Sequence, residues 1–232
     1  MVLQASPVAN DIAVSKCERP AFADFAVPKY VTKQDLGNED FQLLRGAKKL
    51  CVFAVVWFRE RIDVGGKLEI YTATYEPGSQ RKAGELYYEI KIENIWNRPT
   101  IKIHTRPYEV KAGSTAFALE VQTNYLAGTF GEDNDFLDLL LMKFDGKLEN
   151  ILSVQILHSF NYRFCKPQEC EGDNSKSIRN IVLDKKATNG YKNLIVTTTE
   201  RIFSPNKKRK QRVKILPPIT HRWDGNKYNS PQ

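Results

Sequence analysis

Apolar and polar residues alternate with a period of two along most of this chain. Alternation of this kind is typical of strands that bury one face, and it covers residues 67–75, 85–95, 100–105 and 116–126. The longest apolar stretch, LCVFAVVWF at residues 50–58, indicates a buried strand. Further strands are predicted at residues 136–144, 147–164, 177–186, 193–203, 211–216 and 220–228. The chain is therefore predicted to be all-β, with about ten strands in antiparallel sheets that form a sandwich or a propeller-like stack.

Turn signals separate the predicted strands. EPGSQ at residues 76–80 contains a Pro-Gly step, and KAGS at residues 111–114 precedes another strand. Asp-Gly at residues 145–146 lies between apolar strands, which is a strong hairpin signal because both positions tolerate positive φ. A second Asp-Gly step occurs at residues 224–225. These turns favour antiparallel hairpins over parallel strands joined by helices.

One or two short helices are expected besides the strands. The best candidate lies within residues 28–49, where Asn38 is a suitable N-cap, Glu39 and Asp40 fall in the first turn and basic residues come at the end. Residues 1–27 are predicted to be an irregular lead-in. Residues 28–232 are predicted to form a single all-β domain, with residues 112–115 as the point at which a sub-division would fall.

The last third of the chain contains two segments with a strand-and-turn plan. ATNGYKNLIVTTTE at residues 187–200 places Asn-Gly-Tyr before a strand, and HRWDGNKY at residues 221–228 ends in Trp-Asp-Gly-x-x-Tyr. These segments resemble the hairpins of bacterial envelope proteins with FG-GAP-like or half-propeller repeats. Calcium-binding versions of such repeats carry several carboxylates in the turn. Residues 184–190 offer only Asp184 followed by two lysines, which argues against calcium at this turn.

Neither a membrane-spanning helix nor a complete signal peptide is predicted. No apolar run approaches the roughly 18 residues that a membrane-spanning helix needs. Residues 1–20 lack a basic region and a long apolar region, but their small and polar residues resemble what remains after a signal peptide is removed. An ordinary cytosolic N-terminus would have the same composition, so both interpretations stay open.

The four cysteines form one local pair and one distant pair. Cys165 and Cys170 are separated by four residues that include Pro167, whereas Cys17 lies in the lead-in and Cys51 opens the most apolar strand. This spacing fits neither a zinc site nor a two-residue redox motif. Two structural disulfides, Cys165–Cys170 and Cys17–Cys51, fit it better and would place the protein outside the reducing cytosol. Four reduced thiols, with Cys51 as a small buried side chain, are the alternative.

Basic residues are concentrated in one segment. The chain has 35 Lys and Arg against 27 Asp and Glu, a formal net charge of +8 that favours acidic partners. Residues 201–214 contain no acid and seven cations, namely Arg201, Lys207, Lys208, Arg209, Lys210, Arg212 and Lys214. Because turn residues begin at Ser204, this segment is predicted to be the exposed tip of a hairpin. Nuclear import or nucleic-acid binding is the alternative, and docking onto an acidic protein is a third use.

The sequence contains no familiar catalytic motif. His104, His158 and His221 are expected to be packing residues. His158 and Ser159 are adjacent on a strand, so their side chains point to opposite faces and cannot form a nucleophile and base pair. GEDNDFLD at residues 131–138 contains Glu132, Asp133, Asp135 and Asp138, enough oxygen atoms for a metal ion. A polar turn before a buried strand is nevertheless the expected structure of this acidic segment.

These observations favour a non-enzymatic, periplasmic or secreted protein that binds another protein. An immunity or inhibitor protein that blocks a partner toxin or enzyme is the most concrete version. The expected contact residues are tyrosines and cations, namely Tyr71, Tyr75, Tyr87, Lys207, Lys208, Arg209, Lys210 and Arg212. One alternative is a cytoplasmic or nuclear protein that binds nucleic acid through residues 207–214. Another is a metal-dependent hydrolase with Glu132, Asp133 and Asp135 as weak metal candidates. No cofactor is predicted.

Overall fold

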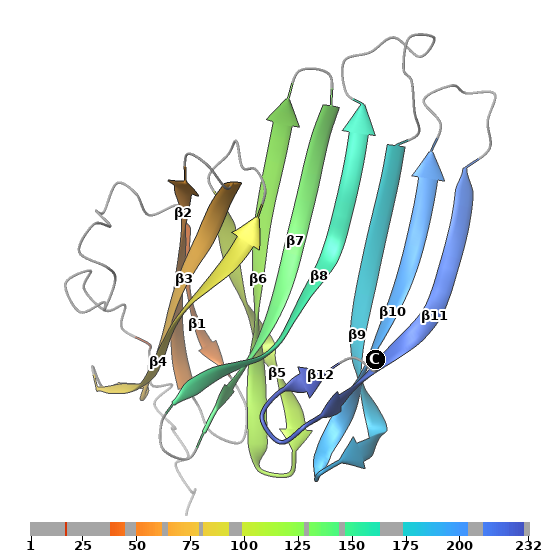
Figure 1. Ribbon diagram of the computed structural model, residues 1–232. Helices are drawn as coiled ribbons and strands as arrows, with labels where there is room; N and C mark the ends of the chain where they lie inside the picture. Colours follow the sequence, from red (N-terminus) through yellow and green to blue (C-terminus); the bar gives the residue numbers. More distant parts are fainter. Residues whose placement is uncertain are drawn as a thin grey trace, which may run out of the picture.

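The chain folds into two antiparallel sheets, as Figure 1 shows for a computed structural model of the protein. The structure describes residues 17, 38–44, 50–61, 65–78, 81–92, 99–127, 130–143, 147–162, 174–203 and 211–229. Strands β1 to β12 account for most of these residues, and no helix is present among them. The predicted all-β class is therefore confirmed.

The smaller sheet is an up-and-down meander of four strands. Its strands follow the order β1-β2-β3-β4, and each pairs antiparallel with its neighbour in the chain. They are β1 (Asn38–Leu44), β2 (Leu50–Arg61), β3 (Gly65–Tyr75) and β4 (Lys82–Ile92).

The larger sheet is a meander of eight strands in the order β12-β11-β10-β9-β8-β7-β6-β5. The turn at residues 112–113 joins the first two strands of this sheet, so both sides of the turn belong to the same sheet. The chain passes from the smaller sheet to the larger one between β4 and β5. The strands are β5 (Thr100–Lys111), β6 (Ser114–Ala127), β7 (Phe130–Met142), β8 (Leu148–Tyr162), β9 (Asn174–Thr188), β10 (Tyr191–Phe203), β11 (Arg212–Trp223) and β12 (Tyr228–Asn229).

The prediction of a helix within residues 28–49 is wrong for Asn38–Leu44, because these residues form strand β1. They pair antiparallel with Leu50–Val56 of β2. Asp40 accepts hydrogen bonds from its neighbour Phe41 N–H (2.8 Å) and from Ile103 N–H of β5 (2.7 Å), so it joins two strand edges. A short segment gains little from helix formation alone, and pairing with the apolar strand β2 sets its conformation. Residues 28–37 and 45–49 lie outside the described residues.

Tight turns join successive strands, as the sequence predicts. Asn189 and Gly190 form a two-residue loop between β9 and β10, and both have positive φ, at 52° and 79°. Such a loop matches the twist of the strands it joins, and Asn-Gly adopts it at low cost. The Asp-Gly step at residues 145–146 lies outside the described residues. Lys143 N–H donates to the Lys147 carbonyl (2.8 Å) across that connection, and the hairpin between β7 and β8 is confirmed.

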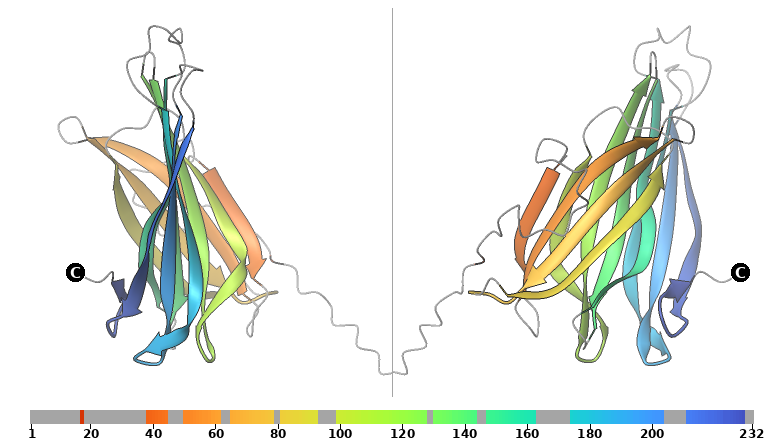
Figure 2. Two further views of the ribbon diagram at one scale, coloured as in Figure 1. Left: turned by 90° about the vertical axis from the view of Figure 1, so that its right-hand side faces the viewer. Right: turned by 60° about the vertical axis from the view of Figure 1, so that its left-hand side comes forward.

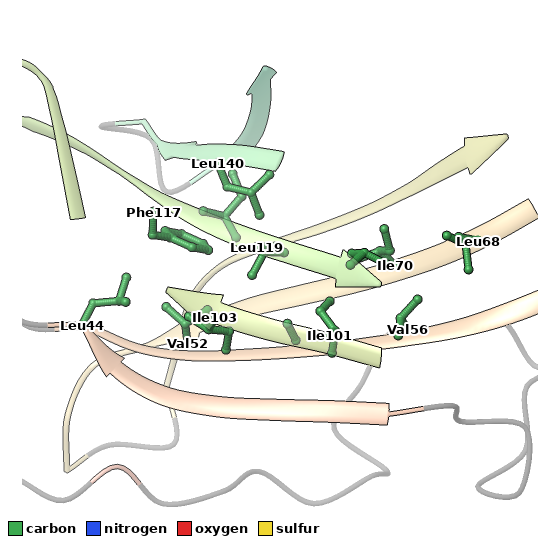
Figure 3. Close-up of a cluster of buried hydrophobic side chains, with 13 residues drawn as sticks. Leu44, Val52, Val56, Leu68, Ile70, Ile101, Ile103, Phe117, Leu119 and Leu140 are labelled. Carbon is green, nitrogen blue, oxygen red and sulfur yellow. The ribbon is translucent and has the colours of Figure 1, made fainter. Parts of the chain in front are cut away.

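A first apolar core lies between the two sheets (Figure 3). The smaller sheet lies over the part of the larger sheet near β5, and β9 to β11 extend beyond it (Figures 1 and 2). This is the packing of a β-sandwich, in which the inner faces of two sheets share one core. The core includes Val52, Val56, Leu68 and Ile70 from the smaller sheet and Ile101, Ile103, Phe117, Leu119 and Leu140 from the larger one.

A second core involves the opposite side of β6 and β7. Along both strands, residues of the second core alternate with residues of the first, as Leu139 and Leu140 illustrate. At the far end of the sheet, Trp223 stacks on Tyr191 with 4.1 Å between ring centroids and meets Tyr228 edge-on at 5.3 Å. The second core also contains Ala116, Ala118, Leu137, Leu141, Ile151, Leu152, Val154, Leu194 and Val196. Half of each central strand is therefore buried on both faces.

A third apolar cluster covers the other face of the smaller sheet. It contains Phe53, Val55, Trp57, Tyr71, Ala73 and Tyr75, and Cys17 packs against it. Cys17 and Cys51 form a disulfide here, as the sequence predicts. The predicted partners Cys165 and Cys170 lie outside the described residues. The fully buried Glu69 accepts a hydrogen bond from Trp57 Nε1, which satisfies one oxygen of a buried carboxylate.

One buried carboxylate connects the two sheets. Asp138 of β7 is fully buried on the face that meets the first core. The Tyr88 hydroxyl of β4 donates to Asp138 Oδ2 at 2.6 Å, and the Ser153 hydroxyl of β8 donates to Oδ1. Burial raises the pKa of Asp138, although these hydrogen bonds act in the opposite direction. Burial also raises the pKa of Tyr88 well above its ordinary range, so the phenol remains a donor.

Tyr88→Phe should lower the free energy of unfolding by about 1–3 kcal/mol, because it removes a donor from a buried carboxylate. Tyr108→Phe is the matched control, since Tyr108 is half-buried and its hydroxyl makes no hydrogen bond to a described residue. The control should change stability by less than about 0.5 kcal/mol. Urea unfolding of both variants measures the difference. Equal effects would contradict a role for the Tyr88 hydroxyl in joining the sheets.

Cys17→Ala should lower the free energy of unfolding by about 3–4 kcal/mol, because the disulfide constrains the unfolded chain over a sequence separation of 34 residues. Denaturant unfolding without reductant measures the loss. Peptide mapping after alkylation of the denatured proteins is the control: Cys51 should be labelled in the variant and protected in the wild type. A labelled Cys51 in the wild type would contradict the disulfide.

Candidate functional site

Two neighbouring rows of side chains cross the larger sheet from β6 to β11. In each strand the two members are two residues apart, so both side chains lie on the same side of the sheet. Cross-strand register places Gln122, Asp135, Leu157, Ile178, Thr199 and Ile215 in the first row. The same register places Asn124, Asp133, Ser159, Lys176, Arg201 and Val213 in the second row. We call these two rows together the two-row face.

The part of the two-row face on β6 to β9 is hollowed and polar. A cavity of about 350 Å³ opens there, and its lining supplies two carboxylates, one ammonium group, two side-chain amides and three hydroxyls. Ser159 Oγ donates to Asp133 Oδ2 at 3.1 Å, and Asn161 Nδ2 donates to Ser159 Oγ at 2.9 Å. The cavity is lined by Thr100, Gln122, Thr123, Asn124, Asp133, Asp135, Leu157, Ser159 and Lys176.

Asp135 is the most perturbed carboxyl group of this hollow. Partial burial and, to a smaller extent, the nearby negative charges of Glu120 and Asp133 raise its pKa to about 6, against an opposing effect of Lys176. Asp135 therefore changes charge near neutral pH, whereas an ordinary aspartate does so near pH 4. The hollow becomes more negative as the pH rises through about 6.

A histidine and glutamate pair lies beside the hollow. His104 Nε2 of β5 lies 2.8 Å from Glu120 Oε2 of β6. Partial burial alone would raise the pKa of Glu120, but hydrogen bonds with His104 and Gln122 outweigh it and lower the pKa. Glu120 therefore stays ionised and adds a fixed negative charge near Asp135.

The acidic segment near Glu132 is part of a strand, so the predicted polar turn is wrong. Residues 131–135 belong to β7 and pair with both β6 and β8. Because side chains alternate along a strand, Glu132 points away from Asp133 and Asp135. Glu132 Oε1 lies 2.9 Å from His158 Nε2 on that other side, whereas Ser159 contacts Asp133. The prediction that His158 and Ser159 point to opposite faces is confirmed.

The weak metal candidates do not converge on one point. Glu132 lies on one side of β7, and Asp133 and Asp135 lie on the other. Over the described residues, no group of three or more His, Cys, Asp or Glu side chains could hold a metal ion. The part of the chain that the structure describes also contains no helix of the length and apolarity needed to cross a membrane.

Two of the three predicted contact tyrosines are buried, so their prediction as surface residues is wrong. Tyr71 and Tyr75 are only 1% and 4% exposed, because the third cluster surrounds them. The Tyr71 hydroxyl donates to Glu85 Oε2 at 2.7 Å. Tyr87, on the neighbouring strand, is 38% exposed and keeps some contact area. Alternation showed which residues share a face but not that both faces of β3 are covered.

The basic run connects two paired strands, as predicted. Ile202 of β10 lies opposite Arg212 of β11, so residues 204–211 join the two strands of a hairpin. Lys207, Lys208, Arg209 and Lys210 lie outside the described residues, whereas Arg212 and Lys214 are exposed. The basic character therefore continues along the strand that follows the run.

The exposed apolar residues of β11 were not predicted from the sequence. Val213 and Ile215 are 57% and 76% exposed, although apolar residues of a strand usually face a core. Their alternation with Arg212 and Lys214 was the available signal, because it predicts one charged side and one apolar side for this strand. Only the register across the sheet shows that Val213 and Ile215 continue the two-row face.

In comparisons with known proteins, no family, no curated protein and no solved structure matches this chain. The resemblance of residues 187–200 and 221–228 to envelope-protein hairpins therefore stays a prediction.

Asp135→Asn should stabilise the protein at pH 7.5 by about 1 kcal/mol, allowing for solvent screening of this half-exposed group. Between about pH 4 and pH 6 the folded state holds a proton on Asp135 that the unfolded state has lost. Wild-type stability therefore falls as the pH rises through this window, and the gain from the variant disappears below it.

Urea unfolding at pH 4 and at pH 7.5 checks this expectation for Asp135. Asp184→Asn is the control, because it removes a carboxylate of the same sheet outside the hollow. The control should not reproduce the pH-dependent gain. A gain from Asp135→Asn that is the same at both pH values would contradict the raised pKa.

Proposed function

We propose that this chain is a non-enzymatic protein that binds another protein through the two-row face. The observation that carries the proposal is the exposure of Val213 and Ile215 at the end of this face. Exposed apolar side chains that lie together and are bordered by polar groups are typical of interaction sites. Val182 of β9 is also exposed, and it lies on the same side of the sheet as Ile178 of the two-row face, so it adds to the exposed apolar side chains of this region.

The charges of the two-row face favour a protein partner over a nucleic acid. Lys176 and Arg201 lie in the same row as Asp133, and Asp135 lies in the next row. Interfaces between proteins commonly combine both signs of charge, which fix orientation. A polyanion would gain from the cations but would be repelled by the carboxylates of the hollow. An inhibitor that covers a partner enzyme or toxin would use a face of this kind.

The disulfide supports a location outside the reducing cytosol, in the periplasm or in the secreted state. Cys17 is bonded to Cys51 next to the third cluster. Structural disulfides persist mainly in oxidising compartments. The proposal is therefore a binding protein that meets its partner in such a compartment.

Ile215→Asp should reduce recovery of the partner at least about tenfold, equivalent to about 1.4 kcal/mol. Cross-linking in the native source, followed by affinity capture and mass spectrometry, measures the recovery. Ile219→Asp is the matched control. Ile219 pairs with Val196 of β10, whereas Ile215 pairs with Thr199. Val196 and Thr199 are three residues apart and point to opposite sides of the sheet, so Ile219 faces away from the two-row face. Partner recovery with this control should match the wild type.

The proposal would be overturned if the wild type, Ile215→Asp and Ile219→Asp captured the same set of proteins. Nucleic acid that is captured by the wild type and retained by Ile215→Asp would favour the alternative of a nucleic-acid-associated protein. Thermal unfolding of each variant confirms that the chain is folded before capture.

A further inference from the structure

We infer that β11 is a docking edge, at which an acidic, extended segment of a partner protein adds a strand to the larger sheet. This inference rests on the proposed function and names the partner class and the mode of binding. Strand addition of this kind gains affinity from main-chain hydrogen bonds and specificity from alternate side chains.

Within the part of the chain that the structure describes, only β12 pairs with the outer edge of β11. β10 pairs with one side of β11, and on the other side β12 pairs only with Arg222 and Trp223. Figure 1 shows β11 at the border of the larger sheet, with β12 at one end of it. Among the described residues, no strand pairs with the outer side of residues 212–221. In an antiparallel strand every second residue directs its N–H and C=O groups to that side.

Two prolines limit the usable edge to residues 212–216. Pro217 and Pro218 carry no N–H, and the register between β10 and β11 shifts at this point. Four of the five residues before the prolines are exposed and the fifth is half-buried. A segment of about five residues has the length of an ordinary strand. It can therefore pair with one added strand.

The side chains of this edge define the partner that fits. Val213 and Ile215 lie on the two-row face, and Arg212 and Lys214 point to the opposite side. Opposite-charge pairs and pairs of β-branched residues are the favourable cross-strand neighbours. A complementary strand therefore alternates acidic residues with apolar, β-branched ones.

The charge of the whole region selects an acidic occupant. Residues 201–223 contain eight Lys or Arg and no Asp or Glu, which equals the formal net charge of +8 of the whole chain. The remaining residues are thus balanced, and the excess lies in this segment of the sequence, which contributes Arg212, Lys214 and Arg222 to β11. A second copy of the chain is a poor occupant, because antiparallel pairing of two β11 strands would bring Arg212 and Lys214 near their own copies.

Protection of an edge strand does not by itself explain these residues. Lysines, prolines and bulges are common means of preventing strands from adding to an edge. On β11 the cations repel another copy of β11 and attract an acidic strand. Val213 and Ile215 remain highly exposed, which protection alone would not favour. The same residues therefore exclude self-association and accept an acidic partner.

A synthetic peptide tests the inference directly. The probe is a fluorescein-labelled, acetylated heptapeptide in which Glu alternates with Val, titrated with the full-length protein at 0.15 M salt. We expect saturable binding by fluorescence anisotropy, with slower hydrogen exchange at the amides of residues 212–216. A heptapeptide in which Lys replaces each Glu should bind at least about tenfold more weakly, because the partner charge is reversed.

Two N-methylated probes separate strand addition from a contact of side chains. One carries N-methyl groups on its Val amides and the other on its Glu amides, so each lacks the donors of one edge. Strand addition predicts that one of the two loses at least about tenfold in affinity and the other does not, since one peptide edge pairs with β11. Equal affinities of the two probes would overturn the inference.

Protein variants complete the experiment. Lys214→Glu should weaken the Glu-Val probe at least about tenfold, whereas Lys227→Glu, at an exposed lysine in the turn before β12, should not. Absence of probe binding, or binding that leaves residues 212–216 unprotected, would overturn strand addition. Neither result touches the proposed function, because that is decided separately by capture with Ile215→Asp and Ile219→Asp.

Discussion

The structure depends on the burial of β6 and β7 on both faces over one half of their length. Leu140 and Phe117 pack in the core between the sheets, and their neighbours Leu139 and Ala118 pack in the second core. Two central strands therefore hold both cores in a fixed relation. Toward residues 131–135 neither core continues, and the same strands carry polar side chains. The two-row face exists because the strands extend beyond the cores that hold them.

Much of the fold could be predicted from the sequence because most strands carry a local signal. The alternation in β4 and β5 and the Asn189–Gly190 turn each identify their own element. The signal failed at Asn38–Leu44, where local capping residues suggested a helix and pairing with β2 produced a strand. It also failed for Tyr71, since alternation does not reveal whether one face or both faces of a strand are buried.

The candidate site was less accessible to prediction because it depends on register across six strands. Asp133, Ser159 and Lys176 are far apart in the chain, and only cross-strand pairing places them in one row. The acidic segment was recognised, but its assignment to a turn concealed that Glu132 and Asp133 serve opposite faces. Val213 resembled an ordinary core residue, because the exposure of a strand depends on what its neighbours leave uncovered.

The meander order of both sheets has a consequence for synthesis of the chain. Each strand pairs with its neighbour in sequence, so every new strand meets its partner as soon as it leaves the ribosome or a translocation channel. The core between the sheets is different, because β1 to β4 are complete before β6 and β7 exist. During that interval the smaller sheet has an uncovered apolar face. That face is fully covered only after β5 to β8 have been made, because these strands supply the other half of the core.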